Sequence, residues 1–200
     1  MTKHPMIYLL GDTEQHSYPL ILTIGREPNQ DLELDNSIGH LNTAEFSKQR
    51  GGVFVTAYTQ IAKQFIGDNT LISQFKGYCL ENNASPILFA NAYPKAIKND
   101  VVNKVQLRAQ LTAEEIRQHI SNLFNCALAK RYALVIQHGV DNSTASQIAQ
   151  QTVKQYCHEL GIDYITSAYF YNGNSEKIQR DLSSVKSNIN AIVAEFTKKR

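Results

Sequence analysis

The chain has 200 residues, of which 42% are hydrophobic and 19% are charged, and its formal net charge is +2. This composition excludes an intrinsically disordered chain, because the apolar residues are numerous enough to offset the entropy cost of ordering the backbone. A sequence pI of about 8.4 lies below the strongly basic range that marks many nucleic-acid-binding domains. The length suits one hydrophobic core, so we expect a single domain over residues 1–200.

The three cysteines, Cys79, Cys126 and Cys157, are odd in number and widely spaced. They form no CxxC pair that would suggest zinc and no even set that would suggest a disulfide framework. We expect reduced, buried thiols, no metal ion and no cofactor. The apolar run near the amino terminus, residues 6–10, is too short for a signal peptide or a membrane span. These features predict a soluble, cytoplasmic protein without a membrane partner, and a monomer is favoured.

Short apolar runs alternate along the chain with longer stretches of helical period, a pattern typical of parallel strands joined by crossover helices. The predicted strands are residues 19–24, 86–91, 132–137 and 162–168. Each is largely apolar, as expected of strands that helices cover on both faces. The polar segment 30–52 is predicted to be the least structured part of the chain.

The predicted helices lie between and after these strands. The first crossover should contain two of them, with apolar faces at Phe54, Tyr58, Ile61 and Phe65, and at Leu71, Phe75 and Tyr78. A capping box at 112–115 opens a helix that closes on 130–131. Asn142 or Ser143 caps the next helix, which ends at Gly161. Asn174 or Ser175 caps one last helix, whose apolar stripe runs to Phe196.

Polar, turn-rich segments follow all four predicted strands, at 25–29, 91–95, 138–142 and 169–174. In an open parallel sheet, ligands bind in the crevice beyond the carboxyl ends of the strands. The first segment contains Gly25 and Pro28, which suit a tight turn, and between them Glu27. By itself Glu27 is equally well explained as a solvated loop carboxylate.

The Gly25-x-x-Pro28 loop after the first strand and Asn91 at the end of the second resemble the uracil-DNA glycosylase superfamily. The resemblance covers residues 20–178 by order of elements. It implies a three-layer α/β/α domain with a four-stranded parallel sheet. It also implies that Glu27 is the catalytic loop residue and that Asn91 reads the base, while Lys95 stands where some branches also have lysine.

The fourth loop departs from the superfamily, whose last loop is often His-Pro-Ser or Asn-Pro-Ser. Residues 169–175 contain no such motif, and no histidine lies near them in the sequence. We expect Asn172 or Asn174 to act as the catalytic donor to the leaving base, and Tyr171 and Ser175 to contact the nucleic acid. The iron–sulfur branches are excluded, because their cluster needs four thiolates and the chain has three cysteines.

Breaking a nucleobase–deoxyribose bond places positive charge on the sugar and negative charge on the base. Glu27 would supply an anion near the sugar and hold the water, and the amide of Asn91 would read the edge of a base that has left the stack. The base pocket would consist of Gly25, Pro28, Asn29, Asn91 and an aromatic side chain from Phe54 or Tyr58. Their position on an apolar helical stripe favours a core role for both aromatics over a role in the pocket.

Arg26 and Lys95 could contact phosphates or could be solvated loop charges. His138, at the end of the third strand, could act as a base or donor, or could have only a structural role. The sequence therefore predicts a DNA repair hydrolase, a nucleobase N-glycosidase that acts on a flipped uracil-like or damaged base. Two alternatives remain open: a non-catalytic descendant that binds a nucleotide, nucleic acid or protein, and a doubly wound hydrolase that uses Glu27, His138 and Asp141.

Overall fold

A six-stranded mixed sheet forms the centre of the molecule, with its strands in the order β3-β1-β4-β2-β5-β6. The computed structural model describes residues 3–26, 33–41, 53–66, 69–95, 110–170 and 172–198, and it describes side chains for all of these except Lys3, 53–57, 65–66, 69–73 and 172. The strands are β1 (Lys3–Leu10), β2 (Leu20–Gly25), β3 (Glu33–Leu41), β4 (Ile87–Asn91), β5 (Tyr132–His138) and β6 (Asp163–Ser167).

The four predicted strands are β2, β4, β5 and β6, and they lie side by side and parallel. The prediction that the sheet has only four strands is wrong. β1 pairs antiparallel with β4, and β3 pairs parallel with β1. β3 lies inside the segment predicted to be least structured, and it was missed because it is an edge strand of mostly half-exposed and polar residues without an apolar run.

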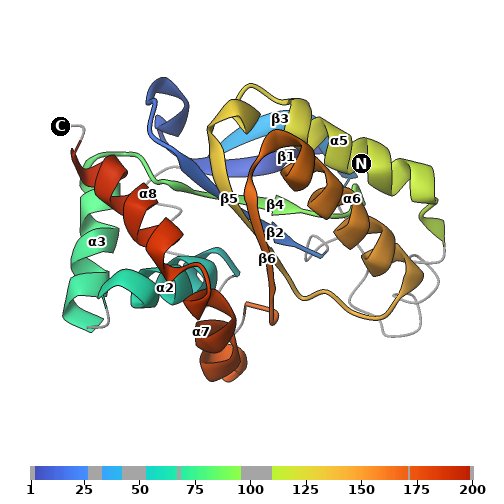
Figure 1. The fold of residues 1–200 in the computed structure, drawn as a ribbon. Helices are drawn as coiled ribbons and strands as arrows, with labels where there is room; N and C mark the ends of the chain where they lie inside the picture. The colour runs from blue at the N-terminus through green and yellow to red at the C-terminus, as the bar shows by residue number, and fades with distance from the viewer. Residues whose placement is uncertain are drawn as a thin grey trace.

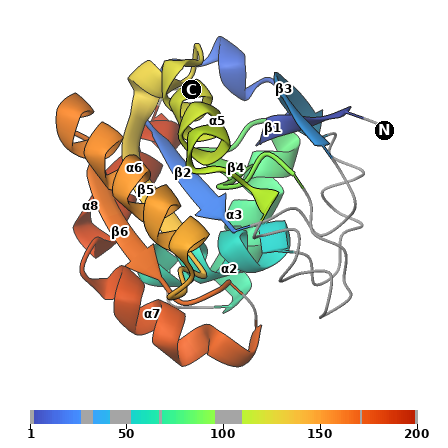
Figure 2. The ribbon, with the colours of Figure 1, turned by 90° about the vertical axis from the view of Figure 1, so that its right-hand side faces the viewer.

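Helices cover both faces of the sheet (Figures 1 and 2). The helices α5 (Ala113–Asn125) and α6 (Thr144–Leu160) lie on one face. The other face carries α2 (Val53–Ile66), α3 (Asn69–Glu81), α7 (Ser175–Ser183) and α8 (Lys186–Lys198). The prediction of two helices in the first crossover is confirmed by α2 and α3.

Most predicted helix ends are confirmed, since they depend on local chemistry. Thr112 and Glu115 form both bonds of the capping box, Ser143 caps α6, and Gly161 ends α6 at φ 67°. The predicted end of α5 at 130–131 is wrong, because that helix stops at Asn125 and residues 129–131 form a separate short 3₁₀ turn.

The predicted last helix is two helices, α7 and α8. At the break, the hydroxyls of Ser183 and Ser184 donate to the carbonyls of Arg180 and Asp181 over 2.6 and 3.0 Å. Serine hydroxyls that bond backbone carbonyls in this way bend or interrupt helices. The apolar stripe is nevertheless buried throughout, at Ile178, Leu182, Val185, Ile189, Ile192 and Phe196.

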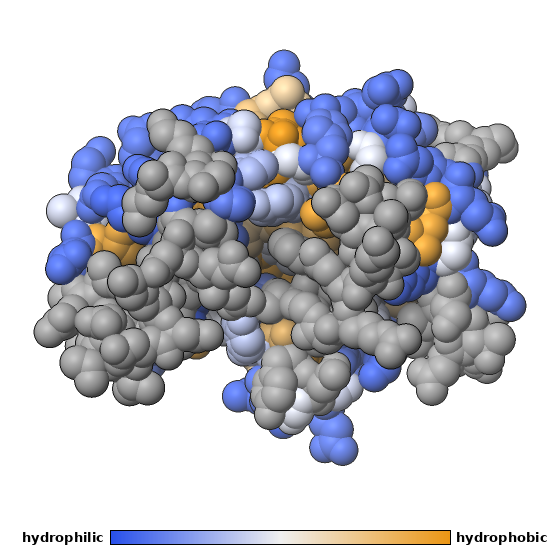
Figure 3. Space-filling model, turned by 180° about the vertical axis from the view of Figure 1, so that it is seen from behind, coloured by the Kyte–Doolittle hydropathy of each residue, from blue (hydrophilic) through white to orange (hydrophobic). Residues whose placement is uncertain are grey.

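The buried apolar side chains form one cluster that runs from Met6 to Phe196. Cys79 and Cys157 are buried, Cys126 is half-buried, and all three are free thiols. Hydrophilic side chains predominate on the described surface in Figure 3, where apolar ones show only in small patches. Within the described ranges, every helix is too short or too polar to cross a membrane.

Substitutions of Gly161 and Gly77 can show how backbone strain affects stability without any effect of side-chain packing. A Cβ at Gly161 or at Gly77 in α3 would meet no atom within 4 Å, but only Gly161 has a positive φ, of 67°. Gly161→Ala should lower the free energy of unfolding by about 1 kcal/mol, because alanine is strained in the left-handed region. Gly77→Ala should raise it by about 0.5–1 kcal/mol through helix propensity. Urea denaturation measures both, and effects of the same sign would contradict this explanation.

Candidate functional site

The carboxyl ends of three adjacent parallel strands, β4, β2 and β5, lie side by side. Gly25 pairs with Asn91, and Ile24 pairs with Gln137, so His138 lies on the other side of Gly25. A Cβ at Gly25 would lie 3.1 Å from Cε1 and 3.3 Å from Nε2 of His138, and 3.5 Å from Oδ1 of Asn91. The glycine therefore lets an imidazole and an amide approach the same point of the backbone.

His138 is buried beneath the fourth loop. Its ring stacks on Phe170 with centroids 4.4 Å apart and an interplanar angle of 5°, and the Tyr169 ring lies 5.5 Å away. The backbone N–H of Phe170 donates to Nδ1 of His138 over 3.5 Å. No histidine lies near this loop in the sequence, but the fold brings His138 to it. The contact arises because His138 pairs with Ser167 in the β5–β6 register.

The buried position of His138 keeps its imidazole neutral. Burial, and after it the nearby Arg26 cation, lowers the pKa of His138 to about 3. Because Nδ1 accepts a hydrogen bond from Phe170, the proton of the neutral ring is on Nε2. Nε2 and the adjacent Cε1 are the ring atoms that lie beside Gly25. A neutral N–H donor thus lies buried beside Gly25, at the carboxyl ends of the strands.

Asn91 is held from two sides. The Ala92 N–H donates to the Gly25 carbonyl over 2.7 Å, which continues the strand pairing. From α5, Nε2 of His119 donates to the Asn91 carbonyl over 2.9 Å. Burial lowers the pKa of His119, although its bond to Asn91 acts in the opposite direction. The side-chain amide of Asn91 is left half-buried beside Gly25.

Arg26 joins the first loop to the third. Its Nη1 donates to Oδ2 of Asp141 over 2.6 Å. The other carboxylate oxygen, Oδ1, accepts from the backbone N–H and the hydroxyl of Ser143, over 3.0 and 2.6 Å. Burial raises the pKa of Asp141, but the Ser143 hydrogen bonds and the Arg26 cation outweigh it and lower the pKa overall. The carboxylate is therefore a stable anion at neutral pH.

The fourth loop is tied down at several points. Asn174 Nδ2 donates to the Tyr169 carbonyl over 3.0 Å, and the Ser175 hydroxyl donates to Gln60 of α2 over 3.2 Å. Gly139 has a φ of 74°, and a Cβ there would lie 2.6 Å from the Tyr169 ring. The loop that covers His138 is thus packed against both the third loop and α2.

Several predicted site residues lie outside the described part of the chain. These are Glu27, Pro28, Asn29 and Tyr171, together with the side chains of Phe54 and Asn172. Their roles stay predictions from the sequence. The described backbone places Phe54 in the first turn of α2 and Asn172 in a short 3₁₀ turn before α7.

Two predicted residues lie away from the three strand ends. Tyr58 is fully buried between α2 and α3, where it stacks on Phe75 at 5.4 Å and bonds to Cys79. This is the core position that its apolar stripe predicts. Lys95 is exposed and pairs with Glu115 of α5 over 2.8 Å, and this bond is the largest cause that lowers the pKa of Glu115 to about 2.

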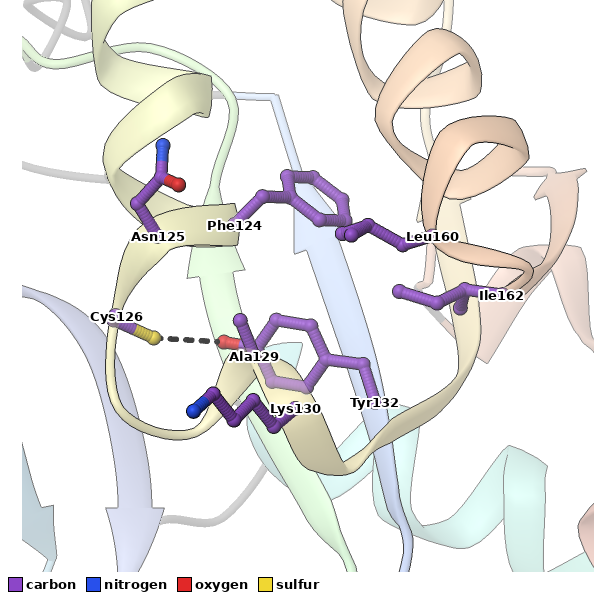
Figure 4. A pocket seen from close by; sticks show the side chains of 8 residues that line it. All are labelled: Phe124, Asn125, Cys126, Ala129, Lys130, Tyr132, Leu160 and Ile162. Carbon is purple, nitrogen blue, oxygen red and sulfur yellow. Dashed lines mark hydrogen bonds between the residues drawn. The ribbon is translucent and has the colours of Figure 1, made fainter.

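A pocket of about 300 Å³ lies near the opposite ends of the strands, where β5 and β6 begin (Figure 4). The ends of α5 and α6 form it, with Phe124, Leu160 and Ile162 around the ring of Tyr132, whose hydroxyl lies 3.3 Å from the Cys126 thiol. It contains none of the predicted site residues. In the described ranges no three histidine, cysteine, aspartate or glutamate side chains are grouped so as to hold a metal ion.

No protein-family model, curated protein or solved structure matches this chain.

The depressed pKa of His138 predicts a pH-dependent stability. An unfolded histidine titrates near 6.5 and the folded one near 3, so the unfolded state binds the additional proton as the pH falls. The stabilising effect of the neutral ring is complete above pH 6.5 and is lost toward pH 3, at up to about 1.4 kcal/mol per pH unit.

Urea denaturation between pH 6 and pH 4 should therefore show a shallower slope of stability against pH for His138→Asn than for wild type, whatever the absolute loss of stability. The control is His158→Asn on α6. This variant keeps the buried imidazoles of His119 and His138 and should retain the wild-type slope. Equal slopes for wild type and His138→Asn would contradict the buried, neutral state of His138.

Proposed function

We propose that the protein is a nucleobase N-glycosidase of the uracil-DNA glycosylase type, which hydrolyses the bond between deoxyribose and a flipped uracil-like or damaged base in DNA. The observation that carries the proposal is the convergence of Gly25, the Asn91 amide and the neutral His138 imidazole at adjacent strand ends. This convergence lies where the chain enters the Gly-x-x-Pro loop that contains Glu27.

The two described side chains have complementary roles in this proposal. The Asn91 amide offers one acceptor and two donors to the polar edge of a base. Nε2–H of His138 donates to the base oxygen on which negative charge develops, and a donor in a water-poor site stabilises such charge strongly. Because the pKa of His138 is about 3, the ring donates a hydrogen bond at neutral pH and remains neutral.

His138 could supply the leaving-group donor that the missing His-Pro-Ser motif provides in the superfamily. In this proposal it takes the leaving-group role that the sequence left to Asn172 or Asn174, and Phe170 holds its ring in place. Glu27 stabilises the positive sugar and holds the attacking water, a role that rests on the sequence alone. The adjacent parallel strands with helices on both faces agree with the three-layer domain that the resemblance implies, with β1 and β3 as additions at one edge.

The low pKa of His138 argues against the alternative hydrolase that uses Glu27, His138 and Asp141. A general base works best with a pKa near the working pH, and that of His138 is about 3. In addition, Nδ1 of His138 accepts from Phe170, and the Asp141 carboxylate binds Arg26 and Ser143.

The direct test uses single- and double-stranded oligonucleotides that contain uracil, hypoxanthine or a mismatch. Wild type should release at least one of these bases, with the abasic product detected by alkaline cleavage. Glu27→Gln, Asn91→Ala and His138→Asn should each lower the rate by about 100-fold or more. The exposed variants Glu159→Gln on α6 and Asn125→Ala on α5 are matched controls that should retain activity. No abasic product from any substrate would refute the proposal, and binding without turnover would favour the non-catalytic descendant.

A smaller change tests the role of Gly25. In Gly25→Ala the new methyl would lie 3.1–3.5 Å from His138 and Asn91, so one of these groups must shift. We expect the base-release kcat/KM to fall by about 10- to 100-fold, since small displacements of reacting groups have effects of this size. Gly77→Ala, in α3, is the matched control and should retain full activity. Unchanged kinetics for Gly25→Ala would show that the reaction occurs elsewhere.

A further inference from the structure

The Arg26–Asp141 ion pair lies at the edge of the candidate site and is partly shielded from solvent. The side chains of Arg26 and Asp141 are 28% and 32% exposed. Arg26 directly follows Gly25, and its charge is close enough to His138 to lower the pKa of that imidazole. The guanidinium is thus next to the point where the strand ends meet, with a carboxylate against it.

Asp141 is held by bonds that do not involve Arg26. Asp141 belongs to the turn that starts α6: its Oδ1 accepts both bonds from Ser143, and its backbone N–H donates to the Ser146 hydroxyl over 2.9 Å. These bonds fix the carboxylate independently of Arg26. Arginine carries five donors on a long side chain and binds carboxylate and phosphate oxygens with the same planar edge.

We propose that Arg26 is a phosphate-binding residue of this site and that the Asp141 carboxylate occupies it in the free protein, so that a phosphodiester group of the ligand displaces Asp141. The ligand class rests on the proposed function, in which the phosphate belongs to DNA beside the flipped nucleotide. The exchange leaves the Asp141 turn intact, because Ser143 continues to hold Oδ1. Binding then replaces one anion on Arg26 by another.

Asp141→Asn is a clean test because an asparagine Oδ1 can still accept from Ser143, while the charge that competes for Arg26 is removed. Its affinity for a phosphodiester should rise by about three- to tenfold, the equivalent of a partly exposed ion pair. The gain should shrink with added salt. Arg26→Gln, which breaks the same pair by removing the cation, should show no gain, and Arg26→Gln/Asp141→Asn should lose the gain of the single variant.

The measurement is fluorescence anisotropy of a labelled single-stranded oligonucleotide without modified bases, with inorganic pyrophosphate titrated in parallel by thermal unfolding. Asp163→Asn, at the start of β6, changes the net charge equally but lies at the other end of the strands, so its affinity should match wild type. If Asp141→Asn binds neither the oligonucleotide nor pyrophosphate more tightly than wild type does, the inference is overturned.

The outcomes also separate this inference from the proposed function. If wild type releases a base but Asp141→Asn binds no more tightly, the glycosidase stands and the displacement of Asp141 is wrong. If no variant binds or cleaves DNA, but Asp141→Asn gains affinity for pyrophosphate that Arg26→Gln removes, the phosphate site stands and the proposed substrate is wrong.

Discussion

The pairing of β2 with β4 on one side and with β5 on the other determines the geometry of the whole candidate site. All six residues of β2 are buried, and the Thr23 hydroxyl donates to the Leu88 carbonyl of β4 over 2.7 Å. In a sheet, a slip of one residue turns every side chain to the opposite face. Such a slip would move Gly25 away from Asn91 and His138 and place Ile24 or Arg26 between them. The burial of β2 therefore protects the position at which a glycine is needed.

Burial at this edge also sets the chemistry that is available there. His138 is covered by Phe170 and lies close to the Arg26 cation, and both effects disfavour a second proton on the ring. The neutral ring keeps one N–H, which can donate a hydrogen bond to a developing anion. The same burial makes the fold less stable in acid, because His138 binds a proton more readily in the unfolded chain than in the folded one. Stability and the proposed catalysis thus depend on one property of His138.

The charge of Arg26 is offset in the free protein by Asp141, which faces it. The net charge of the chain is only +2, so a strong general attraction for nucleic acid is not expected. Affinity for a phosphate would then come from a local exchange of anions on Arg26. Such an exchange contributes less to binding than an unpaired cation, but it disfavours ligands that cannot replace the carboxylate.

The sequence alone determined the features that depend on near neighbours along the chain. The parallel strands, the capping box at Thr112 and the end of α6 at Gly161 follow from local apolar runs and cap chemistry. Gly25 and Asn91 could also be chosen as site residues, because both end apolar strands. The edge strand β3 was missed because it has no apolar run, and the break between α7 and α8 was missed because the apolar stripe continues across it. β1, which lies between β3 and β4, was missed although it contains the apolar run 6–10.

Only the tertiary structure decided which of these residues meet. Arg26 and Asp141 are 115 positions apart, and Phe170 and His138 are 32 apart. Such contacts depend on strand order and register, which arise from packing the whole sheet between its helices. For the same reason, the structure placed Tyr58 in the core and brought a histidine to a loop that has none nearby in the sequence.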